Sequence, residues 1–332
     1  MLRFILRRLA ILPFALILVH FLGFSYAYIA QPIRAARTPY AIVKLGNTHS
    51  LLESYALHIQ DLLHGALLRP PEQGPQISSF AQIFGQSLIA SAGLLAITIT
   101  VSILLGSSLG LLAVQNQPSR VRGWMSLIST VGLSMPGFYV GSLFILIIVF
   151  VRVSVLIGPS ASASIPITGF GWDNHLILPV LALMLHPTVQ IAQVTANMLV
   201  GELGKPYIIA ARSFGHTWRD IRWRQAMRNV IAPVIIAIAG SFRMLVGELI
   251  VVEWLFSWPG LGNLLASTLV PNALSTKLGA NINFLDPPIV AAVITIFGAL
   301  FILTDLIAPI LVRIFEPRLR AEDEAGSGGG RV

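Results

Sequence analysis

Residues 87–114 read SLIASAGLLAITITVSILLGSSLGLLAV and contain no charged side chain. As an α-helix this run would extend about 40 Å, which exceeds the roughly 30 Å hydrocarbon core of a bilayer. A helix is required there, because lipid offers no hydrogen-bond partners to backbone N–H and C=O groups. The run therefore predicts a transmembrane helix.

Similar apolar runs recur along the whole chain, each long enough to cross a bilayer. They lie at 9–30, 125–151, 175–200, 229–256 and 288–312. The first run is longer than the apolar core of a signal peptide, which has roughly 7–15 residues. We therefore interpret it as a retained helix, and the six runs together predict an all-α integral membrane protein with about six transmembrane helices.

The composition also favours a membrane protein. Of the 332 residues, 55% are hydrophobic and only 11% are charged, whereas soluble domains carry about 25% charged residues. The net charge of +8 is compatible with nucleic-acid binding, but the basic residues lie at the ends of the apolar runs, where anionic headgroups attract them. We therefore expect a lipid membrane as a partner and no nucleic acid.

The Lys and Arg residues outside the runs predict the orientation. With the N-terminus inside, one side of the membrane holds 15 of the 22 basic residues. They are Arg3, Arg7, Arg8, Arg120, Arg122, Lys205, Arg212, Arg219, Arg222, Arg224, Arg228, Arg313, Arg318, Arg320 and Arg331. The opposite side holds Arg34, Arg37, Lys44, Arg69, Arg152 and Lys277. We therefore predict a multi-pass protein with both termini in the cytoplasm.

The runs and their connections divide the chain into four regions. They are an N-terminal end with the first helix at 1–30, an extracytoplasmic loop region at 31–86, a five-helix core at 87–315 and a tail at 316–332. The loop region contains an amphipathic stretch, Leu51 to Leu68. The tail is acidic and then rich in Gly and Ser, a composition that predicts disorder.

Segment 201–228, inside the core, carries the signals of a helical hairpin at the cytoplasmic surface. Pro206 suits the first turn of a helix, and Gly215 suits its C-terminal cap. Thr217 can cap a second helix, with Asp220 completing a box-like pattern. From composition alone, this hairpin is either a surface on which a partner docks or a basic segment that rests on lipid headgroups.

Within this segment the sequence resembles the permeases of binding-protein-dependent ABC importers, in particular their dipeptide/oligopeptide/nickel branch. The loop of that family has an Ala-Ala…Gly…Pro signature, and in this branch Arg-x-Ala-x-Arg-Asn stands between the Gly and the Pro. The matching residues are Tyr207, Ala210, Ala211, Arg212, Gly215, Arg224, Ala226, Arg228, Asn229 and Pro233. Two further matches are the stretch 251–262, with Glu253 and Trp258-Pro259-Gly260, and the closing Glu316-Pro317-Arg318.

The resemblance implies a type I ABC importer permease in a bacterial or archaeal cell (inner) membrane. The implied partners are a second homologous permease, two ABC ATPases and an extracytoplasmic solute-binding protein. ATP and Mg would bind to the ATPases, so this chain would be no enzyme and would hold no cofactor. The implied ATPase-coupling residues are Tyr207, Ala210, Ala211, Arg212, Gly215, Arg219, Asn229 and Pro233. The implied cargo is a di- or oligopeptide, with nickel or an oligosaccharide as the alternative.

Four ionisable residues are predicted within or beside the membrane: Arg243, Glu248, Glu253 and Asp305. A charge near the bilayer centre costs about 2.5–3.5 kcal/mol, so each needs a partner or water. Arg243 would pair with Asp305 or Glu248, or would line the translocation path and meet a peptide carboxylate. Glu253, beside the Trp258 turn, is predicted to be a positioning residue. An ion-coupled transporter using Arg243, Glu248 and Asp305 as a relay is the alternative from another class.

No catalytic or metal site is predicted. The chain has no cysteine, and its seven histidines do not follow the spacing of metal ligands on one helix face. The stretch 201–206 faintly resembles a phosphate loop, but its spacing is wrong and Pro206 stands where Ser or Thr is needed.

Overall fold

The computed structural model describes residues 2–35, 50–64, 80–116, 119–155, 165–270 and 285–315. The chain divides into two compact units, which we treat separately. Unit 1 consists of Met1–Leu95, Phe144–Pro179 and Glu248–Ile302. Unit 2 consists of Ala96–Leu143, Val180–Gly247 and Leu303–Val332.

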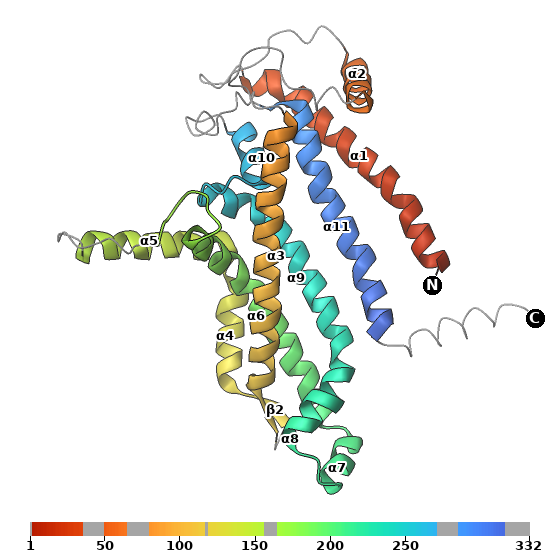
Figure 1. Cartoon of the computed structure of the whole chain (residues 1–332), viewed down its shortest axis with the longest axis vertical. Helices are drawn as coiled ribbons and strands as arrows, with labels where there is room; N and C mark the ends of the chain where they lie inside the picture. Colours follow the sequence, from red (N-terminus) through yellow and green to blue (C-terminus); the bar gives the residue numbers. More distant parts are fainter. Residues whose placement is uncertain are drawn as a thin grey trace, which may run out of the picture. The chain divides into compact units, whose positions relative to one another are not determined.

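Helices make up nearly all of the regular structure (Figure 1). The α-helices are α1 (Leu2–Ala35), α2 (Leu51–Leu63), α3 (Phe80–Ala113), α4 (Gly123–Ser134), α5 (Gly137–Val155), α6 (Ile177–Leu203), α7 (Pro206–Ser213), α8 (Trp218–Asp220), α9 (Met227–Leu255), α10 (Leu261–Leu269) and α11 (Pro287–Phe315). A 3-10 turn, η2 (Asn174–Leu176), precedes α6, and a π-helical segment, η3 (Ile221–Ala226), joins α8 to α9. A small antiparallel hairpin, β1 (Val114–Asn116) and β2 (Ser119–Val121), departs from the expected all-α structure.

Five helices of the described chain are long and apolar enough to cross a membrane. They are Ala10–Ile33, Gln82–Ala113, Asn174–Leu203, Trp218–Leu255 and Pro287–Phe315. The pair α4 and α5 passes the same test only when its two helices are taken together. The prediction of about six spans is therefore confirmed, with the third span as a special case.

The third span, predicted as one apolar run over 125–151, is not a single continuous helix. The structure breaks the run into α4 and α5, which are bent by 96° relative to each other. Met135, between them, has extended backbone angles of −103° and 115°. The cause is Pro136, because the proline ring disfavours helical geometry at the preceding residue.

The fifth predicted run also needs a correction at its start. We expected the basic loop to continue to 228, whereas the span begins at Trp218 and continues through η3 into α9. The second helix of the predicted hairpin is therefore the beginning of a membrane helix. Within η3 the Met227 N–H bonds to the Arg222 carbonyl, the wider repeat that often marks functional sites.

In unit 2 the helices approach closely at small residues. A side chain at Gly110 of α3 would lie 2.6 Å from Thr195 of α6, and one at Gly106 would lie 2.7 Å from the Thr188 carbonyl oxygen. Small residues at such positions let helix backbones touch within lipid. A buried apolar cluster extends this packing, with Met125 of α4, Leu199 of α6 and Ile221 of η3 among its members.

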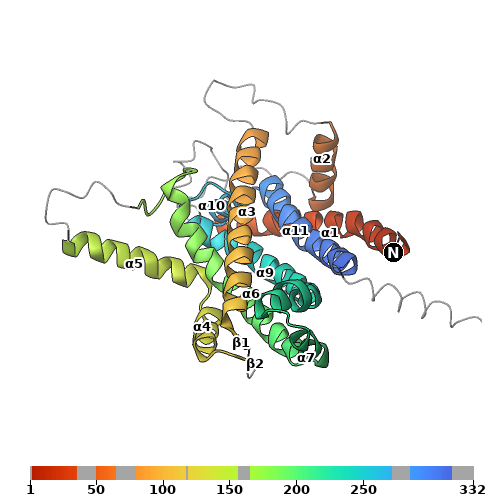
Figure 2. The same cartoon turned by 60° about the horizontal axis from the view of Figure 1, so that its bottom comes forward.

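In unit 1 the amphipathic stretch forms α2, which lies against α1 (Figure 2). The His58 ring stacks on His20 of α1 at 5.3 Å between centroids and on Phe24 at 5.2 Å. Tyr55 adds a hydrogen bond of 3.2 Å between its hydroxyl and Nδ1 of His20. Burial, together with the neighbouring His20, lowers the pKa of His58 to about 4. Residues 65–68 of the predicted stretch, residues 271–284 and the tail 316–332 lie outside the described residues.

Candidate functional site

The candidate site is the hairpin formed by Glu202–Asn229, which we call the α7 hairpin (Figure 1). Pro206 occupies the first turn of α7. At the other end Gly215 has a φ of +84°, its N–H bonds to the Arg212 carbonyl at 3.0 Å, and the His216 N–H bonds to the Ala211 carbonyl at 3.2 Å. This pair of bonds is a Schellman motif, which ends α7 and turns the chain. The predicted helix end at Gly215 is therefore confirmed.

The next helix begins at the predicted cap. Thr217 Oγ1 accepts a hydrogen bond from the Asp220 N–H at 3.2 Å and donates one to Asp220 Oδ2 at 2.6 Å. Arg212 supports the turn between the helices, because its guanidinium donates to the His216 carbonyl at 2.7 Å and lies 4.9 Å from the Trp218 ring centre. The turn is thus fixed by its own side chains.

Glu202, at the end of α6, fixes the start of the hairpin. Its side chain is only 7% exposed, and its Oε1 accepts hydrogen bonds of 2.7 Å from both Tyr207 Oη and Asn229 Nδ2. Lys205 Nζ forms an ion pair of 2.5 Å with its Oε2. Burial and the bond to Glu202 raise the pKa of Tyr207 to about 12. Tyr207 and Asn229, which the resemblance implies as ATPase-coupling residues, both bind Glu202.

A second anchor is Arg222 of η3. Its Nε donates to Asn116 Oδ1 at 2.8 Å, and its Nη2 donates to the Val114 carbonyl at 3.0 Å. A longer bond of 3.4 Å reaches the Leu111 carbonyl in the last turn of α3. Arg222 therefore joins η3 to the end of α3, whereas Arg219 of α8 is exposed.

The two alanines of the signature point in different directions. Ala211 is 7% exposed and packs with Ile208 and Ile221 in the chain's own core, whereas Ala210 is exposed. Of these two implied ATPase-coupling residues, Ala210 is therefore the one that is accessible at the surface of this chain. The opposite surface of α7 is unusually apolar, because Ile209 is 71% and Phe214 83% exposed. We call Ile209, Ala210 and Phe214 the outer face of α7.

Pro233, the last residue of the signature, lies inside α9. A proline has no N–H, so the carbonyl of Asn229 loses its usual helical partner next to the Glu202 network. The flanking Val230 and Val234 are buried against Ile191 of α6. Pro233 thus belongs to the base of the hairpin.

The ionisable residues within the membrane helices are used in different ways. Arg243 of α9 forms an ion pair with Asp305 of α11, as one of the two sequence interpretations of Arg243 requires. Glu248, one turn and a half further along α9, is half-buried. In this pair each charge stabilises the other, which offsets the cost of placing either of them in lipid.

Glu253 is fully buried at the end of α9, and its carboxylate binds the start of α10. Its Oε2 accepts from the N–H groups of Gly262 and Asn263 at 2.7 and 3.2 Å, and its Oε1 accepts from Ser91 Oγ at 2.6 Å. Ser91 Oγ in turn accepts from the Leu261 N–H at 2.7 Å. The cap position of α10 is Gly260, which has no side chain, so Glu253 provides the capping carboxylate from another helix.

The contact between Glu253 and the start of α10 requires glycine at two nearby positions and is covered by aromatic side chains. A side chain at Gly260 would lie 2.1 Å from Glu253 Oε1, and one at Gly262 would lie 2.5 Å from the Ile250 Cα atom. Trp258 is completely buried, donates to the Ala90 carbonyl at 3.1 Å and packs edge-on against Phe170 and Trp172. The stretch 251–262 is therefore a rigid corner between α9 and α10.

Comparison with known proteins identifies the family. The family described as "binding-protein-dependent transport system inner membrane component" matches residues 102–321. The dipeptide transport system permease protein DppB of Escherichia coli is 26% identical, with 96% of this chain and 99% of that protein covered. The oligopeptide transport system permease protein AppB of Bacillus subtilis is 26% identical, with 68% of this chain and 67% of that protein covered.

Among solved structures, an inward-facing form of the MetNI methionine ABC transporter is similar in fold. Its TM-score is 0.50 at 17% sequence identity, and the match covers 71% of this chain and 97% of the other. The family predicted from the signature residues, the permease fold and the non-enzymatic role are thereby confirmed. The chain belongs to the binding-protein-dependent transport system inner membrane components and is a multi-pass permease subunit of an ABC importer.

Proposed function

We propose that this permease imports di- or oligopeptides and that the outer face of α7 is the surface that docks on an ABC ATPase. The observation that carries the docking proposal is the contrast between the two sides of α7. Its inner side is bound by Glu202 and the core, while Ile209 and Phe214 are left exposed. An exposed apolar pair on a rigid support is typical of a protein contact.

The same anchors support a mechanism for transmitting motion. A force on α7 would reach α6 through Glu202 and the end of α3 through Arg222. It would reach α9 directly, because α8, η3 and α9 form one continuous span. Closing of the ATPases on ATP would in this way tilt three membrane helices together, and hydrolysis would reset them.

The remaining partners and the orientation complete the proposal. We infer a second homologous permease, two ATPases and an extracytoplasmic solute-binding protein, with both termini of this chain in the cytoplasm. The support for the orientation is the excess of Lys and Arg on the α7 side of the apolar runs. Fusing green fluorescent protein or alkaline phosphatase to the C-terminus tests it: only the first should be active, and an active phosphatase would reverse the orientation.

Docking is testable by cross-linking, because the chain contains no cysteine and single cysteines report unambiguously. Variants Ile209→Cys and Phe214→Cys, in membranes that contain the complete transporter, should form cross-links to the ATPase subunit with a short bifunctional thiol–amine reagent. The matched control is Leu127→Cys on α4, which is 72% exposed but lies on a membrane helix. Equal cross-linking of all three, or of none, would contradict the docking surface.

The support for peptides as cargo is the naming of several relatives as dipeptide or oligopeptide permeases. Uptake of a labelled dipeptide by cells that depend on this transporter should be suppressed by excess unlabelled di- and tripeptides. Suppression by nickel or by oligosaccharides, with no effect of peptides, would instead assign the alternative cargo. Because the family is driven by partner ATPases, the charged residues of α9 and α11 are not needed as an ion relay.

A further inference from the structure

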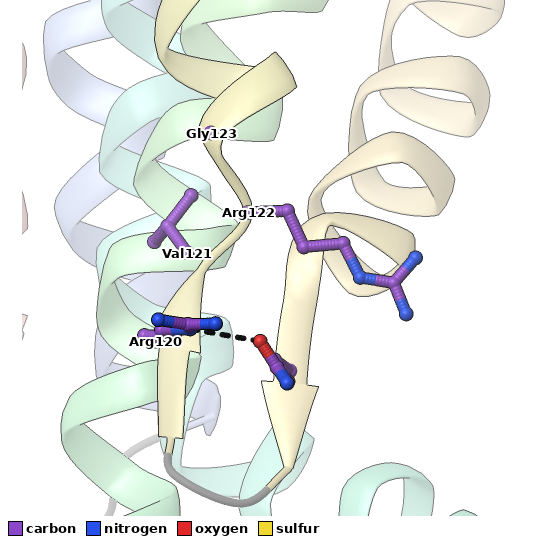
Figure 3. Close-up of a pocket in the computed structure, with 5 residues that line it drawn as sticks. Arg120, Val121, Arg122 and Gly123 are labelled. Atoms are coloured by element: carbon purple, nitrogen blue, oxygen red, sulfur yellow. Dashed lines mark hydrogen bonds between the residues drawn. The ribbon is translucent and has the colours of Figure 1, made fainter.

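The β1–β2 hairpin, which connects α3 to α4, borders an open pocket with a volume of about 610 Å³ (Figure 3). The pocket is lined by Gln115, Arg120, Val121, Arg122 and Gly123. Two of the five lining residues carry a guanidinium group, and none carries a carboxylate. A side chain added at Gly123 would meet nothing within 4 Å, so the pocket is open on that side.

Both arginines have donors to spare. Arg120 pairs across the hairpin with Gln115, and its Nε donates to Gln115 Oε1 at 2.8 Å. The dashed line at Arg120 in Figure 3 marks this bond. Its terminal nitrogens are not used in that bond, and a guanidinium carries five N–H donors in all. Arg122 is exposed and forms no ion pair with any residue in the described part of the chain. The pocket therefore presents two cations with unused donors.

A third cation lies nearby and adds to this charge. Arg222 binds the hairpin only through neutral oxygens, the carbonyl of Val114 and the side-chain amide of Asn116. Its charge and that of Arg122 repel each other. Because Arg120 and Arg122 line the pocket and Arg222 binds the same hairpin, an anion that enters the pocket would be attracted by all three guanidinium groups.

The position of the hairpin along the chain indicates which anion. The apolar span of α3 ends at Ala113, one residue before β1, and the apolar helix α4 begins at Gly123, one residue after Arg122. The pocket therefore lies where two hydrophobic helices end, at the depth of the lipid headgroups. Trp124, in the first turn of α4, is a residue type enriched at the same depth.

We infer that this pocket binds the phosphate of an anionic membrane lipid, held by the guanidinium groups of Arg120 and Arg122. Paired N–H donors of arginine match phosphate oxygens geometrically, and basic pockets at the ends of membrane helices are suited to such headgroups. The occupied pocket would also offset the repulsion between Arg122 and Arg222. In this way the lipid would stabilise the contact through which η3 is joined to α3.

The test is equilibrium binding of labelled phosphatidylglycerol to the full chain, purified in neutral detergent with its associated subunits. The double variant Arg120→Gln/Arg122→Gln should weaken binding about tenfold or more, since bonds to charged groups are lost. The matched control, Arg224→Gln/Arg228→Gln, removes two exposed cations of the α7 hairpin outside the pocket and should change binding less than threefold. A charge-retaining variant, Arg120→Lys/Arg122→Lys, should bind more tightly than the Gln double variant and less tightly than the wild type, because it keeps both charges and loses the paired N–H donors.

Three results would overturn the inference. Equal weakening by both Gln double variants would mean that the lipid responds to overall charge. Equal competition by phosphatidylcholine, or inorganic phosphate that displaces the lipid at equal concentration, would mean that the pocket does not select an anionic lipid. Loss of a co-purified ATPase subunit from the Arg120/Arg122 variant, with lipid binding unchanged, would identify the pocket as a protein contact.

Discussion

The buried carboxylate of Glu253 gives a sharp prediction for stability. The variant Glu253→Leu replaces it by an apolar side chain of similar size and leaves the Ser91 hydroxyl and the N–H groups of Gly262 and Asn263 without their acceptor. Each buried donor without a partner costs about 1–3 kcal/mol. With three such donors we therefore expect a total loss of at least about 3 kcal/mol, which would lower the melting temperature by about 10 °C.

A second substitution at the same position separates hydrogen bonding from packing. In Glu253→Gln the amide oxygen can still accept from both N–H groups, while its NH2 group can donate to Ser91 Oγ. The only donor that loses its acceptor is then the Ser91 hydroxyl, so we expect a loss of about 1–2 kcal/mol. The order of stability should be wild type, then Gln, then Leu.

The assay is thermal unfolding of the purified chain in detergent, followed by tryptophan fluorescence. Trp258 lies in the same corner and is completely buried, so it reports on this region. The control is Glu53→Gln on α2, where the carboxylate is exposed and the melting temperature should hardly change. If Glu253→Leu melts within about 2 °C of the wild type, the carboxylate does not hold α10 and the reasoning is refuted.

Three further predictions concern other parts of the chain. The neutral His58 has a pKa of about 4 against about 6.5 when unfolded, so its stabilisation of the α1–α2 contact is complete above pH 6.5 and is lost as the pH falls towards 4. The shift corresponds to about 3 kcal/mol, which screening by nearby solvent reduces to about 2 kcal/mol; His58→Gln should remove this dependence in pH-dependent melting, and His64→Gln should not. Gly215→Val should lower uptake per ATP hydrolysed while leaving the protein in the membrane, because the positive φ of Gly215 strains any side chain by about 1–2 kcal/mol although the space around it is open. The control is Gly204→Ala, where a methyl group meets only ordinary contacts at 3.7 Å, and full coupling in Gly215→Val would contradict the role of the turn. Arg243→Gln and Asp305→Asn should each lower the amount of protein in the membrane, because each leaves the other charge without its ion-pair partner, and the double variant should restore the amount. Unchanged uptake by Arg243→Gln at a normal protein level would exclude contact between Arg243 and the substrate.

The membrane helices could be predicted from sequence because their signal is length and apolarity alone. The break between α4 and α5 was missed, since hydropathy is continuous across it, yet the pair Pro136-Gly137 carried a usable local signal. The continuation of α8 and η3 into α9 was missed because hydropathy is low there, not because it is continuous. Charged side chains made 218–228 look like a loop, although charges do not end a helix.

Within the hairpin, the caps and turns could be predicted from the sequence, whereas the contacts between distant residues could not. Pro206, Gly215 and Thr217 act through backbone groups a few residues away, so their roles follow from spacing. Glu202 binds Asn229, which lies 27 residues further along, and Arg222 reaches back across more than 100 residues to Asn116. No local pattern predicts such contacts, and none decides that Ala211 faces inward while Ala210 faces outward.

The central claim is that the outer face of α7 couples ATP hydrolysis to transport, and Phe214→Asp tests it most directly. The side chain is 83% exposed, so the substitution should leave the fold intact while removing an apolar contact with the ATPase. The neighbouring His216→Asp introduces a negative charge without removing apolar surface and serves as the control. The measurement is peptide uptake and ATP hydrolysis by the complete transporter in liposomes.

We predict that Phe214→Asp lowers uptake at least tenfold, since loss of a central apolar anchor costs about 2 kcal/mol or more at an interface. The control His216→Asp should retain more than half of the wild-type uptake. Uptake and hydrolysis of Phe214→Asp at wild-type levels would show that the outer face of α7 does not couple to the ATPase, and the account would be wrong.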